Sequence, residues 1–192
     1  VKDTIGMEEP FRHRNKTTFS VGMKDNQVCI GPYEQGTYNT VDINSCLLQS
    51  DESDNVIKIF RKLMIKYNIK AYDKKTDKGI VRNIVIRSNR INHLMLIIVT
   101  ASENFRNKDI INTRDTNLVM GTKNITLYGE GTINDTIDDL VFTISPETFF
   151  QINSVQTEKL YKTAIEYADI SKDDTCFDIY CGIGTISLMA AR

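Results

Sequence analysis

The sequence lacks tryptophan, and it has only three prolines and four cysteines in 192 residues. It also lacks an apolar run near the roughly 20 residues that span a bilayer, which argues against a membrane protein. The cysteines, at 29, 46, 176 and 181, show no CxxC spacing, and no signal peptide precedes them. A disulfide framework is therefore not expected. The expected location of the protein is the reducing cytoplasm. With a net charge of −1, a uniformly basic nucleic-acid binder is also not expected, although local basic patches remain possible.

The composition is otherwise that of an ordinary soluble protein, with 41% hydrophobic and 26% charged residues. A chain of this length can bury a core in one domain or in two small ones. It starts with Val1 rather than methionine, and residues 186–192 resemble a helix without a C-cap signal. We therefore expect a piece of a longer protein.

The first hundred residues alternate strand and helix signals. N-cap chemistry at Ser50 predicts a helix over about 53–67, and Asp25-Asn26 predicts a tight turn. The run 94–99 is apolar on both faces, which is typical of a central strand. Mixed strands with a packed helix predict an α+β domain. The expected strands are 18–21, 28–31, 40–43, 80–87 and 93–100, with strand-like stretches at 118–121, 125–129 and 140–145; the buried helix face would hold Val56, Ile57, Phe60, Leu63, Met64 and Tyr67.

Two basic clusters lie in this part of the chain. The first could be a solvated strand edge or a set of phosphate contacts, and the sequence leaves both interpretations open. The first cluster holds Arg12, Arg14 and Lys16, and the second holds Arg82, Arg87 and Arg90.

The stretch 175–187 has the order strand, tight turn, helix. Gly182 and Gly184 allow a sharp bend and a close approach to a ligand, and the helix that follows directs free N–H groups to the same place. The third glycine of the dinucleotide fingerprint is missing, since Ser187 stands there. Alone, this stretch indicates a cofactor site of unspecified kind.

A second informative stretch, 145–153, precedes a predicted helix. Asn153 with Gln156 resembles a capping box, and the apolar face of the helix would hold Val155, Leu160, Tyr161, Ala164, Ile165 and Ala168. We expect a domain boundary near residues 140–146, which divides the chain into 1–144 and 145–192.

Both stretches resemble those of the S-adenosylmethionine-dependent RNA uracil-5-methyltransferases. The resemblance is carried by residues 142–153 (FTISPETFFQIN), by Gln156 with the run 158–161, and by residues 178–185 (DIYCGIGT). It extends more weakly to 12–16 and 79–82. It implies a central RNA-facing α+β domain, then the first elements of an incomplete Rossmann-like methyltransferase domain.

The resemblance also implies site residues. Gln151 would contact the cofactor and Phe149 would line the base pocket, whereas Phe150 is expected in the core. The cofactor turn would use Tyr180, Gly182, Gly184 and Thr185; Asp178 would anchor the turn or the ligand ammonium, or only cap the turn. The basic residues of both clusters would contact RNA phosphates.

The family chemistry implies a cysteine that adds to uracil C6, so that C5 can accept the methyl group before a base removes the C5 proton. That cysteine and base are expected after Arg192, because Cys181 is expected to be a packing residue of the turn. Many family members hold a 4Fe–4S cluster, for which Cys46 would be a single ligand, or else a plain buried cysteine.

The preferred hypothesis is therefore that the chain is part of a cytoplasmic enzyme that methylates uridine C5, in rRNA rather than tRNA. The fragment itself is expected to be inactive. The alternatives are a non-catalytic RNA- or protein-binding module and a methyltransferase of another substrate. Residues 101–115 look too few for the helix that relatives usually have there. The sequence indicates neither the modified uridine nor the oligomeric state.

Overall fold

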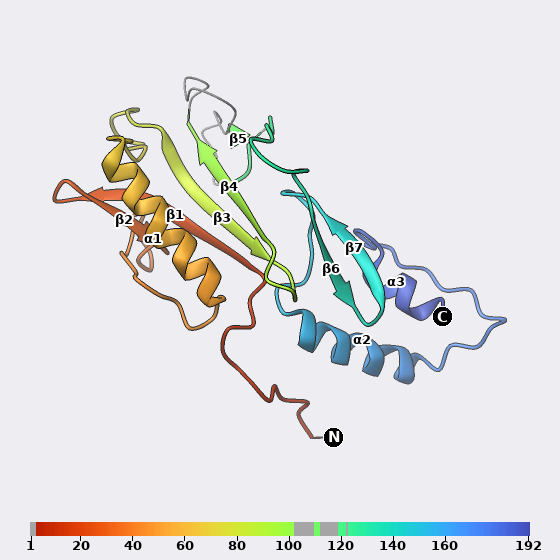
Figure 1. Cartoon of the computed structure of the whole chain (residues 1–192). Helices are drawn as coiled ribbons and strands as arrows, with labels where there is room; N and C mark the ends of the chain where they lie inside the picture. The colour runs from red at the N-terminus through yellow and green to blue at the C-terminus, as the bar shows by residue number, and fades with distance from the viewer. Residues whose placement is uncertain (1–2, 102–109, 112–118, 122) are drawn as a thin grey trace.

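The computed structural model describes residues 3–101, 110–111, 119–121 and 123–192. Its elements fall into two groups that lie side by side (Figure 1). The first is a sheet crossed by a helix: β1 (Lys16–Lys24), β2 (Gln27–Gly31), α1 (Asp51–Lys66), β3 (Val81–Ser88), β4 (Leu94–Thr100) and β5 (Ile110–Ile111). The second is a hairpin with two helices: β6 (Ile133–Ile137), β7 (Leu140–Ile144), α2 (Ser154–Ala168) and α3 (Thr185–Ala190).

The five-stranded sheet has the order β2-β1-β3-β4-β5, and it is mixed because β4 and β5 pair in parallel while the other pairs are antiparallel. The predicted α+β arrangement of a mixed sheet and a packed helix is thus confirmed. The predicted turn is present as well, since Asp25 and Asn26 both have positive φ values, 51° and 64°, as tight hairpin turns require. The run predicted to be central forms β4, which is paired on both sides, but β3 is the middle strand.

Helix α1 packs against the sheet by a narrow apolar stripe. Its N-cap is Ser50, whose hydroxyl accepts a hydrogen bond from the Ser53 amide at 3.2 Å, as the sequence predicts. Ile57, Phe60 and Met64 are buried in the core with Ile30 and Ile84.

Two residues predicted on that buried face are not buried, since Leu63 and Tyr67 are 41% and 63% exposed. Leu63 precedes Met64 by one residue, or about 100° around the helix, and so lies outside the stripe that faces the sheet.

The second group has a core of its own. Ile137, Phe142 and Ile144 of the hairpin pack with Phe150 and with Met189 of α3. The hairpin, which precedes the predicted boundary at residue 145, thus shares its core with elements that follow it. The predicted apolar face of α2 is largely wrong: Val155 and Leu160 are 50% and 60% exposed, and the buried residues of α2 are Ser154 and Thr157.

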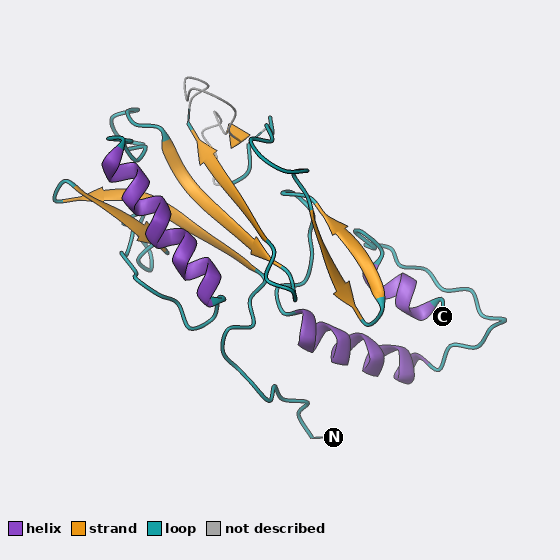
Figure 2. Ribbon diagram, in the orientation of Figure 1, coloured by secondary structure: helices purple, strands orange, loops and turns teal. Residues whose placement is uncertain are grey.

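Three predicted strands are absent from the described residues. Residues 40–43 form only one isolated bridge, Tyr33 with Thr40, because the Asp42 carboxylate takes the Ile30 amide at 2.9 Å that a strand partner would use. The stretch 125–129 is irregular, and 175–180 belongs to the long connection between α2 and α3 (Figure 2). Most of the stretch 101–115, which looks too short for the helix that relatives usually have, and Leu118 of the stretch 118–121 lie outside the described residues. None of the described helices is both long and apolar enough to cross a membrane.

Candidate functional site

The loop 145–153, between β7 and α2, is held against the sheet by Arg87 at the end of β3. The Arg87 side chain is buried, with 2% of the residue exposed, and its guanidinium donates to the carbonyls of Pro146, at 3.1 Å, and Thr148. Burial lowers the pKa of Arg87, because a charged group loses hydration there. Arg87 therefore fixes the first half of the loop.

Asn15, just before β1, holds the other half. Its backbone amide donates to Ile152 O at 2.8 Å, and its carbonyl accepts from the Ser88 amide at 2.9 Å. Its side-chain amide donates to Gln151 O at 2.8 Å and to the Ser154 hydroxyl at 2.9 Å. One residue thus joins the sheet, the loop and the first turn of α2.

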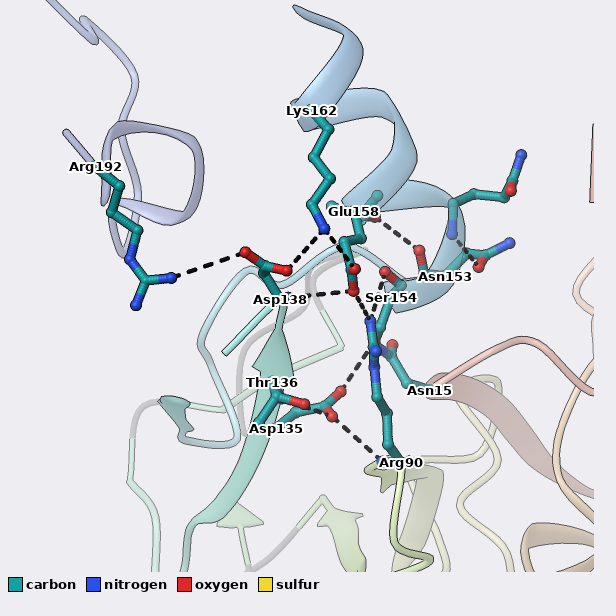
Figure 3. Close-up of polar contacts among 12 residues, drawn as sticks. Asn15, Arg90, Asp135, Thr136, Asp138, Asn153, Ser154, Glu158, Lys162 and Arg192 are labelled. Carbon is teal, nitrogen blue, oxygen red and sulfur yellow. Dashed lines mark hydrogen bonds and ion pairs between the residues drawn. The ribbon is translucent and has the colours of Figure 1, made fainter. Parts of the chain in front are cut away.

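The contacts of Ser154 continue into a polar network between the two groups of elements (Figure 3). The Ser154 hydroxyl donates to Asp135 Oδ2 at 3.0 Å, and Asp135, 3% exposed, also accepts from the Arg90 amide. The Arg90 guanidinium reaches α2, where it donates to Ser154 O at 3.1 Å and pairs with Glu158 at 2.9 Å. Lys162 pairs with Glu158 at 3.1 Å. The network ties the β3–β4 turn to β6 and α2.

The electrostatics of Glu158 reflect this position. Burial acts to raise the pKa of Glu158, but hydrogen bonds from Lys162 and Arg90 outweigh it, and the net shift is downward. Lys162 also pairs with Asp138 at 2.7 Å, and the hydrogen bonds from its two carboxylate partners raise its own pKa. Both pKa shifts favour the charged forms, so the ion pair between Glu158 and Lys162 is intact at neutral pH.

The anchored loop presents its two aromatic residues in opposite directions. Phe150 is 3% exposed and packs on Phe142 with ring centroids 6.0 Å apart, so its expected core position is confirmed. Phe149 is 74% exposed. Beside it, the half-buried Gln151 lines an open hollow of about 300 Å³, together with Ile5 from the N-terminal segment and Lys159 from α2. The loop thus exposes the Phe149 ring and places the Gln151 side chain at an open hollow.

The glycine turn has the expected backbone. Gly182 and Gly184 have φ values of 58° and 77°, and the space that a Cβ would fill at Gly182 is open. Tyr180 is 95% exposed. Asp178 accepts a hydrogen bond from the Ser187 hydroxyl at 2.5 Å. This contact between two side chains braces the first turn of α3, which has no side-chain cap hydrogen bond.

Thr185 links the turn to α2 through a 3.1 Å hydrogen bond between its hydroxyl and that of Tyr161. Within the described residues, no hydrogen bond or ion pair joins Gln151 to this turn. The two halves of the predicted cofactor site are therefore not joined by a polar contact. The turn still fits a small polar ligand, because its backbone is open at Gly182 and an exposed aromatic ring lies two residues away.

The predicted basic clusters are less uniform than the sequence suggested. Arg82 and Arg87 stand at opposite ends of β3, about 17 Å apart at 3.3 Å per residue, so the second cluster is not one patch. The Arg82 guanidinium lies 5.4 Å from the centre of the Tyr72 ring. A phosphate contact is wrong for Arg87, which is buried, and Arg90 is bound to Ser154 and Glu158.

In the first cluster, the Arg12 guanidinium is occupied by internal contacts. It pairs with Asp54 at 2.8 Å and Asp51 at 2.9 Å and donates to Cys46 O, which ties the N-terminal segment to the start of α1. Arg14 is exposed. Lys16 is half-buried, and burial and the nearby charge of Arg87 lower its pKa. Arg14 and Arg90 are thus the exposed members of the predicted phosphate contacts, and of these two Arg90 is bound to Ser154 and Glu158.

Cys46 is half-buried and unpaired, and its amide donates to Asp54 at 3.0 Å. Among the described residues, no group of three or more His, Cys, Asp or Glu side chains could hold a metal ion. The residues present thus do not assemble a cluster site around Cys46.

Sequence reasoning gave no role to Asn15, Asp135, Ser154 or Glu158, although they organise the site. Asn15 and Glu158 carried a signal, since they lie within the stretches 12–16 and 158–161 that resemble the family. Asp135 and Ser154 are ordinary polar residues, and the partners that join them to the sheet lie far away in sequence, 139 residues for the bond between Asn15 and Ser154 and 45 for that between Arg90 and Asp135.

No family model matches the chain. Two curated relatives align with all of it: an uncharacterized RNA methyltransferase of Oceanobacillus iheyensis, 40% identical, and one of Clostridium tetani, 36% identical. In each case the chain covers 46% of the relative, so it spans about half the length of the curated relatives it matches.

Among solved structures, the Pyrococcus abyssi tRNA (uracil-54, C5)-methyltransferase in complex with S-adenosyl-L-homocysteine superposes with a TM-score of 0.80 at 22% identity, covering 96% of this chain and 47% of that one. The chain thus has the fold of part of a methyltransferase. By sequence it is similar over its whole length to proteins named RNA methyltransferases, which confirms the resemblance drawn from its motifs.

Proposed function

We propose that the protein containing this chain transfers a methyl group from S-adenosylmethionine to C5 of a uridine in RNA. The observation that carries the proposal is the alignment of the whole chain with RNA methyltransferases, at 36% and 40% identity. The fold agrees, since the superposed structure is that of a tRNA (uracil-54, C5)-methyltransferase. Ribosomal RNA is the preferred substrate and transfer RNA the second.

The described residues would perform two tasks. Exposed Phe149, on a loop anchored by Arg87 and Asn15, would stack on an unpaired base. S-adenosylmethionine would supply the methyl group, held by Gln151 and by the turn with Gly182 and Gly184. The residues of the turn meet at an open surface, as a bound ligand needs.

Uracil C5 is a weak nucleophile, so we propose that a cysteine thiolate adds to C6 and is eliminated after methyl transfer and loss of the C5 proton. The cysteine and the base are assigned to the part of the protein outside this chain. The segments 1–144 and 145–192 are proposed as an RNA-facing domain and the start of the catalytic domain. The hairpin of β6 and β7 belongs by sequence to the first segment, but it shares a core with α2 and α3 of the second.

The test uses the full-length protein, S-adenosylmethionine, and rRNA or tRNA labelled with tritium at uridine C5. Methylation at C5 releases one tritium for each methyl group added, and nucleoside mass spectrometry identifies 5-methyluridine. Absence of both signals with either RNA would refute the proposal. A methyl group on another base or on protein would support a methyltransferase of another substrate, and RNA binding without any transfer would support a non-catalytic binding module.

A further inference from the structure

Helix α1 carries a row of lysines on its solvent side. Lys58, Lys62 and Lys66 are exposed and recur every four residues, so they follow one side of the helix over about 12 Å, at about 6 Å per step. Residues 55–70 include no aspartate or glutamate. In a chain with a net charge of −1, this is a local concentration of positive charge.

The fold does not account for this lysine row. Lysines four residues apart on a helix repel one another and cost about 0.2–0.5 kcal/mol per pair. Within the described part of the chain, none of the three has an ion pair, and Lys66 only lies 5.3 Å from the centre of the Tyr67 ring.

Helix α2 is the internal comparison, because its lysines are neutralised. Lys162 pairs with Asp138 and Glu158, and Lys159 lies 3.9 Å from Glu8. On α1, Arg61 also has a partner, since it pairs with Asp42. The absence of neutralising partners is therefore a property of the lysine row and not of every helical cation in the described residues.

We infer that the lysine row of α1 binds the phosphate backbone of the substrate RNA, away from the loop that carries Phe149. Three mobile ammonium groups in a line suit successive phosphates of one strand, and such contacts carry no sequence information. Exposed Ile59 and Leu63, 58% and 41% accessible, flank the row and offer apolar surface to riboses and bases. The inference rests on the proposed function, since RNA is the polyanion that a related enzyme would handle.

The test compares full-length wild type with the triple variant Lys58→Gln, Lys62→Gln, Lys66→Gln. The control variant, Lys24→Gln, Lys123→Gln, Lys172→Gln, removes the same charge from exposed lysines elsewhere. Binding of a fluorescein-labelled 20-nucleotide oligouridylate is measured by anisotropy between 50 and 200 mM salt, and thermal melting followed by circular dichroism checks that each variant is folded.

Three contacts to a single strand contribute about 2 to the slope of log affinity against log salt. Wild type should therefore lose about 20-fold more affinity than the lysine-row variant over this range, and the control should behave like wild type. Equal slopes for wild type and the lysine-row variant, or equal losses in the two variants, would overturn the inference. An acidic protein partner would give the first of these results.

The two proposals fail in different ways. Normal 5-methyluridine formation with an unchanged salt slope would reject the lysine row and keep the proposed function. A slope that depends on the lysine row, in a protein that methylates no RNA, would support the lysine row and reject the proposed function.

Discussion

Arg87 allows a sharp test of how the aromatic loop is positioned. In the variant Arg87→Met, the apolar stem of the side chain is kept and both hydrogen bonds to the loop carbonyls are lost. Bonds from a charged donor contribute about 1.5–3 kcal/mol each. The cost of burying the guanidinium, which the lowered pKa of Arg87 reflects, is relieved at the same time. We expect a net loss of about 2–4 kcal/mol in the free energy of unfolding.

The matched control is Arg14→Met, which removes the same charge at an exposed position and should change stability by less than about 0.5 kcal/mol. Urea denaturation measures both variants. Hydrogen exchange of residues 145–153 then tests the loop directly, because a 2 kcal/mol loss of local stability accelerates exchange about 30-fold where the native loop protects its amides. Equal stabilities for the two variants, with unchanged exchange in the loop, would refute the anchoring role of Arg87.

Three further predictions concern the loop, the polar network and α1. Phe150→Ala should cost about 3–5 kcal/mol in urea denaturation, whereas Phe149→Ala should cost less than about 0.5 kcal/mol yet reduce tritium release; equal stability losses would contradict the assigned exposures. Because the pKa of Glu158 lies below its ordinary 4.5, its contribution is present above about pH 4.5 and is lost as the pH falls through the folded-state value. Glu158→Gln should therefore flatten the stability profile in that acidic range, and an unchanged acid limb of the urea midpoints would argue against it. Ser50→Ala should destabilise the chain by about 1 kcal/mol through loss of the α1 cap, measured as a lower urea midpoint against Ser171→Ala as a surface control.

The elements with local signals were predictable from the sequence. The Ser50 cap, the Asp25-Asn26 turn and the Asn153 cap each depend on residues within four positions, and the structure has all three. The apolar periodicity of α1 located the helix but not the width of its buried stripe, because that width depends on the surface it packs against.

The contacts that build the site were not predictable in the same way. An arginine on a strand has the same sequence pattern whether it meets solvent or, like Arg87, carbonyls 59 and 61 residues away. The stretch 175–180 has the residue composition of a β-strand. A β-strand forms only when another strand pairs with it, and none of the described residues pairs with this stretch. The glycine turn was correctly predicted as a bend, whereas its link to α2 through Thr185 was not.

The unpaired stretch 175–180 also affects how this chain behaves on its own in solution. Phe177, Ile179 and Tyr180 are 87%, 83% and 95% exposed, on a backbone that has no ladder partner among the described residues. Such a stretch can recruit the same stretch of another molecule, the first step of aggregation. The isolated 192-residue chain should therefore self-associate with increasing concentration, and Ile179→Lys should suppress this in light scattering. Any binding measurement on the isolated chain has to be made at concentrations below that association.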